Sequence, residues 1–248
     1  MNISIIFVAI IALIIGCRSD DFPSHIKRCK NGDHTCIANT MNELIKVSAS
    51  GIRELGVVPT DPYEIADVIV EKGEESPINI KIHYEKCNIT GIDSIHVDKV
   101  TGFEKDPKTS KFRMRGHLKL STISGPYQVS GKVLLLPITG RGWSEIKFEN
   151  VSLRVSLQTH VDTRNGKEFL IIDRVVVKME TEKLRIKLEN LFNHKELSDG
   201  MNAILNDNDQ LIFKELQVPL QNVLEKVARQ IVAPVFNKFP YNEMFLDE

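Results

Sequence analysis

Ser156, His160 and Asp162 come nearest, in this 248-residue chain, to a hydrolytic constellation. A serine nucleophile, a histidine base and an orienting acid must converge in one pocket beside an oxyanion hole. These three residues instead share the outward side of one expected strand, because alternate strand residues point the same way. The sequence also has no Gly-x-Ser-x-Gly, His-Glu-x-x-His or phosphate-cradling glycine motif. We therefore expect a protein that is not an enzyme, with a secreted lipid esterase as the rival hypothesis.

Four side chains of types that bind zinc, Cys29, Asp33, His34 and Cys36, lie close together near the start of the chain. A structural zinc site needs four ligands, and these patterns usually draw on two separated pairs. The second pair is absent here, so we expect neither a metal nor any other cofactor.

An apolar run over residues 3–15 predicts a secretory signal peptide, residues 1–19, with cleavage after Cys17 or Ser19. The run is too short to cross a bilayer as a helix. Residues 14–17 also resemble a bacterial lipoprotein box, which would leave Cys17 lipidated. The favoured signal-peptide interpretation predicts a secreted, extracellular protein.

Secretion exposes the cysteines to an oxidising compartment, where Cys29 and Cys36 should form a disulfide. Closing so short a loop stabilises the fold by only about 2.5 kcal/mol in the chain-entropy estimate. Cys87 is then a buried, unpaired thiol. Asn88 and Asn150 begin glycosylation sequons, and Asn150 shares the outward parity of its strand, so it is the better candidate for modification.

A long amphipathic helix is expected over residues 209–238, with Pro219 and Pro234 kinking or locally breaking it. It would run roughly 45 Å, which is about the diameter of a domain of this size. Its apolar stripe is formed by Ile212, Leu216, Leu220, Val223, Leu224, Val227, Ile231 and Val235. The opposite face, expected to be solvated, carries Lys214, Gln217, Gln221, Glu225 and Arg229. Residues earlier in the chain must cover the stripe.

Apolar and polar residues alternate with period two through much of the preceding chain, which predicts antiparallel sheet with one wet face. The apolar sets are Ile78, Ile80, Ile82 and Tyr84; Phe112, Met114, Leu118 and Leu120; Val151, Leu153, Val155 and Leu157; and Leu184, Ile186 and Leu188. Residues 133–136 and 170–177 are more continuously apolar, so we expect cover on both faces. Turns are expected at residues 106–107, 125–126, 140–142 and 165–166.

These elements predict one α+β domain over residues 20–248, in which a long, curled antiparallel sheet wraps round the C-terminal helix. The formal net charge is only −1, so nothing in the overall field favours nucleic acid or an anionic membrane as partner. After residue 19 no second long apolar run occurs, so we expect no integral membrane association, and we expect a monomer.

Several motifs, in order and spacing, resemble the insect takeout and juvenile-hormone-binding protein family, in its circadian-clock-controlled, daywake-like branch. The matching segments are Cys29 and Cys36 around an acid, residues 51–56, 61–65, 131–138, 140–142, 205–208, 212–216 and 236–241, and Tyr127. The resemblance covers residues 22–245. It implies a super-roll fold, in which a curved sheet and a long helix enclose an apolar tunnel for a lipophilic ligand.

Two features depart from the family pattern. Asp209 adds an acid after residues 205–208, and Cys87 has no partner for the second disulfide of the moth hormone carriers. The departures put specificity for juvenile hormone in doubt. Fatty acids and other terpenoid or quinone-like lipids fit an apolar tunnel equally well.

The predicted function is a secreted carrier of a small lipophilic ligand, since apolar walls alone can bind such a molecule. The side chains expected to line the tunnel are Met41, Leu44, Ile45, Met114, Leu118, Leu120, Val133, Leu135, Leu153, Val155, Leu216, Leu220, Val223, Leu224, Val227 and Ile231. Each could equally be ordinary core, because core and tunnel walls use the same residue types. The other alternative is a secreted interaction protein that carries no cargo and acts on a cell-surface receptor or a membrane, in clock- or feeding-related signalling.

Overall fold

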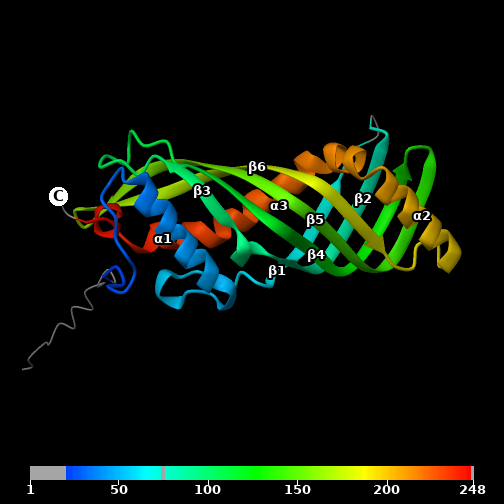
Figure 1. The fold of residues 1–248 in the computed structure, drawn as a ribbon, viewed down its shortest axis with the longest axis horizontal. Helices are drawn as coiled ribbons and strands as arrows, with labels where there is room; N and C mark the ends of the chain where they lie inside the picture. Colours follow the sequence, from blue (N-terminus) through cyan, green and yellow to red (C-terminus); the bar gives the residue numbers. More distant parts are fainter. Residues whose placement is uncertain (1–20, 74–75, 247–248) are drawn as a thin grey trace, which may run out of the picture.

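The computed structural model describes residues 21–73 and 76–246; the expected signal peptide, residues 1–19, lies outside them. Their strands form one antiparallel sheet. Its path is β1 (Tyr63–Glu71), β2 (Ile78–Thr90), β4 (Arg113–Val133), β5 (Leu136–Arg164) and β6 (Lys167–Leu188), and β3 (His96–Thr101) pairs with β4 beside β2. Figure 1 shows the long strands curling along the molecule, as the sequence predicted.

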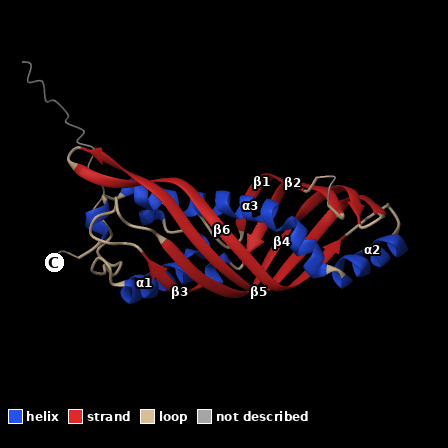
Figure 2. Ribbon diagram, turned by 90° about the horizontal axis from the view of Figure 1, so that it is seen from above, coloured by secondary structure: helices blue, strands red, loops and turns tan. Residues whose placement is uncertain are grey.

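The helices lie inside and at the ends of this curl (Figure 2). They are α1 (His34–Val47), α2 (Lys195–Asp207) and α3 (Asp209–Lys238), with short 3-10 turns η1 (Ser48–Ser50), η2 (Arg53–Leu55), η3 (Ile92–Ser94) and η4 (Tyr241–Met244). α3 runs along the sheet. α1 packs on β3, and α2 lies at the opposite end of the molecule from α1. α3 continues through Pro219 and Pro234 as one helix, so a local break is absent and only the kink stays a prediction. Packing against the sheet holds the turns on both sides of each proline.

Two expected turns lie inside strands. Residues 125–126 are within β4 and residues 140–142 are within β5. A side chain on Gly125 would place Cβ 2.7 Å from the Lys86 oxygen, and one on Gly142 would place it 2.5 Å from the Glu189 oxygen. Glycine is needed there because neighbouring backbones approach too closely for a side chain. The turn at residues 165–166, between β5 and β6, is confirmed.

Residues 133–136, expected to be covered on both faces, form the tip of the β4–β5 hairpin. Val133 pairs with Leu136, and Leu134 and Leu135 make the turn between them. Leu135 is 93% exposed. The expectation was wrong because a run of leucines does not distinguish a buried strand from an apolar hairpin tip.

Residues 170–177 alternate rather than being covered on both faces. Leu170 and Ile172 are buried, and so are Val175 and Val177, while Asp173 lies exposed between the two pairs. The register of β5 and β6 shifts near this point. Before the shift the even-numbered residues of β6 point inward, and after it the odd-numbered residues do. The apolar run therefore looks continuous in the sequence.

β6 lies at one edge of the sheet, and side chains from α2 bond to its free backbone groups. Asn202 and Asn206 each accept from the N–H and donate to the C=O of one residue, Leu188 and Ile186 respectively, over 2.7–2.9 Å. Asn202 and Asn206 are four residues apart on α2, which corresponds to about 6 Å along the helix axis. Ile186 and Leu188 are two residues apart on β6, which corresponds to about 6.8 Å along the strand. The helix and strand repeats therefore match, and the edge is covered rather than open to another chain.

α3 continues this cover along β6. Asp209 Oδ2 accepts from Leu184 N–H at 3.0 Å, and Gln217 Nε2 donates to the Met179 oxygen at 2.8 Å. Asp209, the acid that departs from the family pattern, thus accepts a hydrogen bond from a free backbone N–H at the edge of the sheet. The helix face expected to be solvated is only partly so, since Gln217 is half-buried against β6.

The two ends of the described chain meet beside α1. Cys29 and Cys36 form the expected disulfide, with Cα atoms 5.8 Å apart. Asp33 accepts from the Cys36 N–H at 3.0 Å and so caps α1. The Cys29 oxygen also accepts from Leu246 N–H at 2.9 Å. The disulfide therefore ties the segment before α1 to the C-terminal segment.

Candidate functional site

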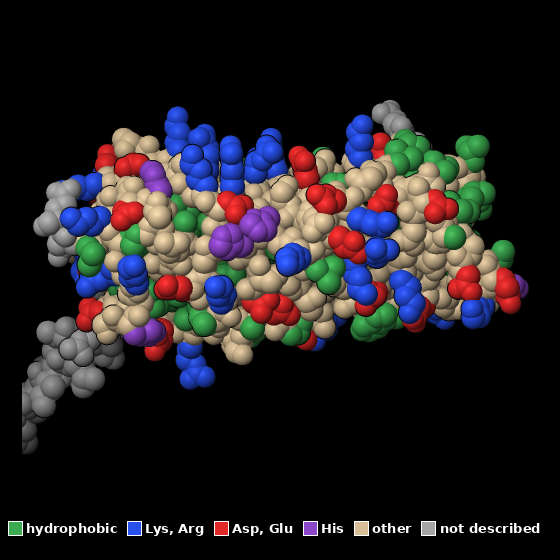
Figure 3. Space-filling model, viewed as in Figure 1, with side chains coloured by type: hydrophobic (Ala, Val, Ile, Leu, Met, Phe, Trp, Pro, Cys, Tyr) green, Lys and Arg blue, Asp and Glu red, His purple; other side chains and the backbone are tan. Residues whose placement is uncertain are grey.

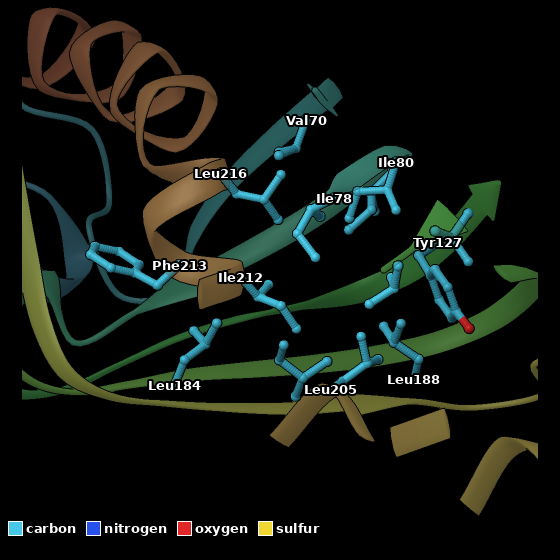
Figure 4. Packing of buried hydrophobic residues seen from close by; sticks show 14 of the residues in the cluster. Val70, Ile78, Ile80, Tyr127, Leu184, Leu188, Leu205, Ile212, Phe213 and Leu216 are labelled. Carbon is cyan, nitrogen blue, oxygen red and sulfur yellow. The ribbon is translucent and has the colours of Figure 1, made fainter. Parts of the chain in front are cut away.

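The inner face of the curl holds an apolar cavity between the sheet, α2 and α3. The empty space between its wall atoms is about 1060 Å³, counting the mouth, and about 80 Å³ of it can hold the centre of a water-sized sphere. Figure 4 shows part of the wall, including Val70 and Ile80 from β1 and β2, Leu184 and Leu188 from β6, Leu205 from α2, and Ile212, Phe213 and Leu216 from α3.

Simple periodicities place these side chains. On β2, Ile80, Ile82 and Tyr84 line the cavity from alternate positions. On α3, Ile212, Leu216, Leu220 and Val223 do so from successive turns of one helical face. The sheet and the helix thus contribute matching apolar walls to one enclosed space.

The described residues that line the cavity include no charged side chain. The polar groups are the hydroxyls of Tyr84 and Ser121 and the thiol of Cys87. Ser144 Oγ donates to the Tyr84 hydroxyl oxygen at 2.8 Å, and Ser121 Oγ donates to the Thr90 oxygen at 2.9 Å. A ligand would therefore meet a wall that is almost wholly hydrocarbon.

Burial keeps the two weak acids of the wall protonated. Desolvation raises the pKa of Tyr84 to about 12 and that of the Cys87 thiol to about 11. Neither a phenolate nor a thiolate forms near neutral pH, and only these anions would be strong nucleophiles. The geometry and protonation of the wall suit binding better than acid–base or covalent catalysis.

The structure brings five of the sixteen residues expected in the tunnel into the cavity wall: Val133, Leu216, Leu220, Val223 and Leu224. Nine others pack in neighbouring parts of the core: Leu118 and Leu153 in the cluster that surrounds the cavity, Met41, Ile45 and Met114 around α1, Leu44 near η2, Val227 and Ile231 beside β1, and Val155 against β6. For these nine, the predicted contact with a ligand stays a prediction.

Two of the sixteen point away from the interior. Leu135 lies at the hairpin tip, and Leu120 on β4 is 44% exposed. Leu118 is buried, but farther along β4 the residues that line the cavity are Ser121, Ile123 and Val129. The inward parity therefore changes from even to odd between residues 118 and 121. Leu120 was predicted to point inward because Leu118 does, and this prediction was wrong because the inward side changes between the two residues.

Most of the cavity wall came from segments that the sequence analysis had not assigned to it. Val68 and Val70 lie on β1, a strand that was not predicted, and the residue between them is the apolar, exposed Ile69. The inward residues of β2 and of β6 near Leu184 were recognised as sheet, but not as tunnel wall. The three consecutive apolar residues 68–70 hide the period of two on β1, and no period shows which inward residues face empty space.

The hydrolytic constellation is not assembled. His160 Nδ1 lies 2.8 Å from Asp173 Oδ1, not beside Asp162, which pairs with Arg164 Nε at 2.7 Å. Both the histidine and its partner are on the exposed face. The zinc hypothesis also fails, since the disulfide occupies both cysteines, and residues 21–73 and 76–246 contain no cluster of ligands that could hold a metal.

The two sequons differ in exposure. Asn150 is exposed on β5 with a positive φ of 50°, and its Nδ2 donates to Glu182 Oε2 at 2.6 Å. Asn88 is half-buried on β2. The outward position expected for Asn150 is confirmed; its glycosylation stays a prediction.

Comparisons with known proteins agree with this architecture. The family model described as "Haemolymph juvenile hormone binding protein (JHBP)" matches residues 5–246. The circadian clock-controlled protein daywake of Drosophila melanogaster is 27% identical over 242 residues, covering 94% of this chain and 93% of that protein. Its counterpart in Drosophila yakuba is 25% identical over 235 residues, covering 93% and 90%.

Among solved structures, the crystal structure of Epiphyas postvittana Takeout 1 has the same fold, with a TM-score of 0.75 at 24% identity. The alignment covers 88% of this chain and 98% of that structure. In the part of the chain that the structure describes, no helix combines the length and the apolar character needed to cross a bilayer.

Proposed function

Because the chain belongs to the haemolymph juvenile hormone binding protein (JHBP) family, we propose that it is a secreted carrier that binds one small lipophilic ligand in the cavity between its sheet and α3. The observation that carries the proposal is the uncharged, almost wholly hydrocarbon wall on an enclosed space. A soluble fold gains nothing from an unfilled apolar cavity, because its wall atoms lose packing contacts.

The ligand class follows from the wall. A chain of about twelve methylenes gains roughly 10 kcal/mol on burial, and the costs of association reduce this to a net affinity that is at best near micromolar unless the cavity is well preorganised. A carboxylate or phosphate could not be buried against this wall without a partner. The favoured cargo is therefore a terpenoid, fatty-acyl or quinone-like lipid whose polar end stays at the mouth or is uncharged.

Secretion is part of the proposal, and the buried disulfide supports it. A bond between Cys29 and Cys36 persists in extracellular compartments and is rare in the cytosol. The apolar run over residues 3–15 supplies the matching export signal.

A titration with a fluorescent fatty-acid probe tests the binding function. We expect saturable binding of one probe per chain, competition by unlabelled terpenoid or fatty-acyl lipids, and loss of affinity in Leu216→Asp, which puts a carboxylate in the wall. The matched control is Val218→Asp, an exposed site on the same helix, where binding should persist. Equal probe binding by both variants would place the ligand outside the cavity.

A further inference from the structure

The β4–β5 hairpin ends in four consecutive exposed apolar residues, Leu134, Leu135, Leu136 and Pro137. They lie at the end of the molecule remote from the C-terminus (Figure 1), where hydrophobic side chains project from the surface in Figure 3. A convex projection of this kind offers no groove for a peptide or helix. We propose that this hairpin tip inserts into the surface of a phospholipid bilayer and brings the cavity to the membrane for ligand exchange.

The turn sequence goes against the requirements of folding. Two-residue hairpin turns favour Asn and Gly, because the backbone takes positive φ there. This chain has two leucines instead, and Leu134 has φ 56°. Leucine both strains that backbone and exposes hydrocarbon to water. A turn that is unfavourable in both respects points to a use outside the fold.

The tip is continuous with the cavity. Val133 and Ile138 flank it on the same hairpin, and both line the cavity wall. Ligand exchange at the tip would bring a lipid next to the part of the cavity wall that Val133 and Ile138 form, and both of these side chains are buried. This step rests on the proposed carrier function; the attachment of the tip to a bilayer does not.

The polar groups around the tip are compatible with a headgroup layer. Leu134 N–H donates to the Pro77 oxygen at 2.7 Å, so this backbone donor is satisfied without water. Lys132 is exposed, two residues before the turn, and forms no ion pair with any described residue. Lys72 is paired with Glu215 at 3.5 Å. Among the described residues near the tip, Lys132 is thus an unpaired cation, which fits zwitterionic lipid with the lysine reaching the phosphate level.

Sedimentation with sucrose-loaded phosphatidylcholine vesicles tests the proposal. The secreted protein should bind, and Leu135→Ser should weaken binding about tenfold, since it removes one buried leucine from the lipid contact. Leu135 is 93% exposed, so the variant should fold and melt as the unchanged protein does. Val47→Ser is the matched control, because Val47 is 63% exposed at the end of α1, away from the tip.

A spectroscopic measurement reports the contact directly. Trp143 is the single tryptophan, so Leu135→Trp in a Trp143→Phe background gives a probe at the tip alone. Vesicles should shift its emission to the blue, and brominated acyl chains should quench it. An unshifted, unquenched tip tryptophan would overturn the proposal.

Two other outcomes would also overturn it. Equal loss of vesicle binding in Leu135→Ser and Val47→Ser would mean that the tip has no special role. A concentration-dependent dimer that Leu135→Ser abolishes, without vesicle binding, would make a second copy the occupant. Probe binding in solution is measured separately, and Leu135→Ser should leave it unchanged, so failure of the carrier function and failure of tip insertion are distinguishable.

Discussion

Replacing Val223 with tryptophan should fill the cavity without breaking the fold. Val223 is half-buried on α3, lines the cavity and packs against the surrounding core. An indole at position 223 would enter the cavity from α3 and obstruct it, because only about 80 Å³ is open to the centre of a water-sized sphere. Ligand binding should then fall below detection while the melting temperature stays near that of the unchanged protein.

The matched control is Val175→Trp. Val175 is buried on β6 and does not itself line the cavity, although Leu224 of the cavity wall packs against its cluster. Overpacking such a site costs about 1–3 kcal/mol, which lowers the melting temperature by roughly 2–12 °C for a chain of this size. Thermal unfolding and titration with a fluorescent fatty acid measure both quantities. The reasoning is refuted if Val223→Trp destabilises as much as Val175→Trp while its folded fraction binds the probe normally.

Three further predictions concern the edge of the sheet, the cysteines and the sequons. Asn206→Leu should destabilise the fold by about 1–3 kcal/mol in urea unfolding, since it leaves an N–H and a C=O of β6 unpaired; an unchanged midpoint would contradict this. Intact-mass analysis with alkylation should find Cys29 and Cys36 bonded and Cys87 labelled only after unfolding. Burial raises the pKa of the Cys87 thiol from 9.0 to about 11 because the folded state favours the protonated thiol. This preference stabilises the folded state fully below pH 9, and the stabilisation is lost as the pH rises through 11. Secreted protein should lose a glycan mass shift in Asn150→Gln but not in the same change at the other sequon; no glycan at either site would refute the exposure argument.

The architecture was largely predictable because period two and period 3.6 extend over long stretches. The inward residues Ile78, Ile80 and Ile82 and the stripe of α3 are where these periods put them. The prediction failed where the strands change parity, as between Leu118 and Leu120. Such a change depends on how a long strand bends against its neighbours, and a single sequence carries no local signal for it.

The cavity itself was less predictable than the fold. Val223 and Val227 are one turn apart on the same stripe, yet Val223 faces the empty space and Val227 packs beside β1. The difference lies in what each meets across the interior, which only tertiary structure determines. The contacts of Asn202 and Asn206 with β6 were missed for a related reason: on a helix, two asparagines four residues apart look solvated until a strand edge is placed beside them.

Mass spectrometry of lipids extracted from the folded, secreted protein tests the carrier function most directly. After exposure to a total lipid extract and removal of free lipid, the account predicts about one terpenoid, fatty-acyl or quinone-like molecule per chain, and none on Val223→Trp treated identically. Lipid on both proteins in equal amount, or on neither at concentrations well above micromolar, would contradict the assignment of the cavity as a ligand site.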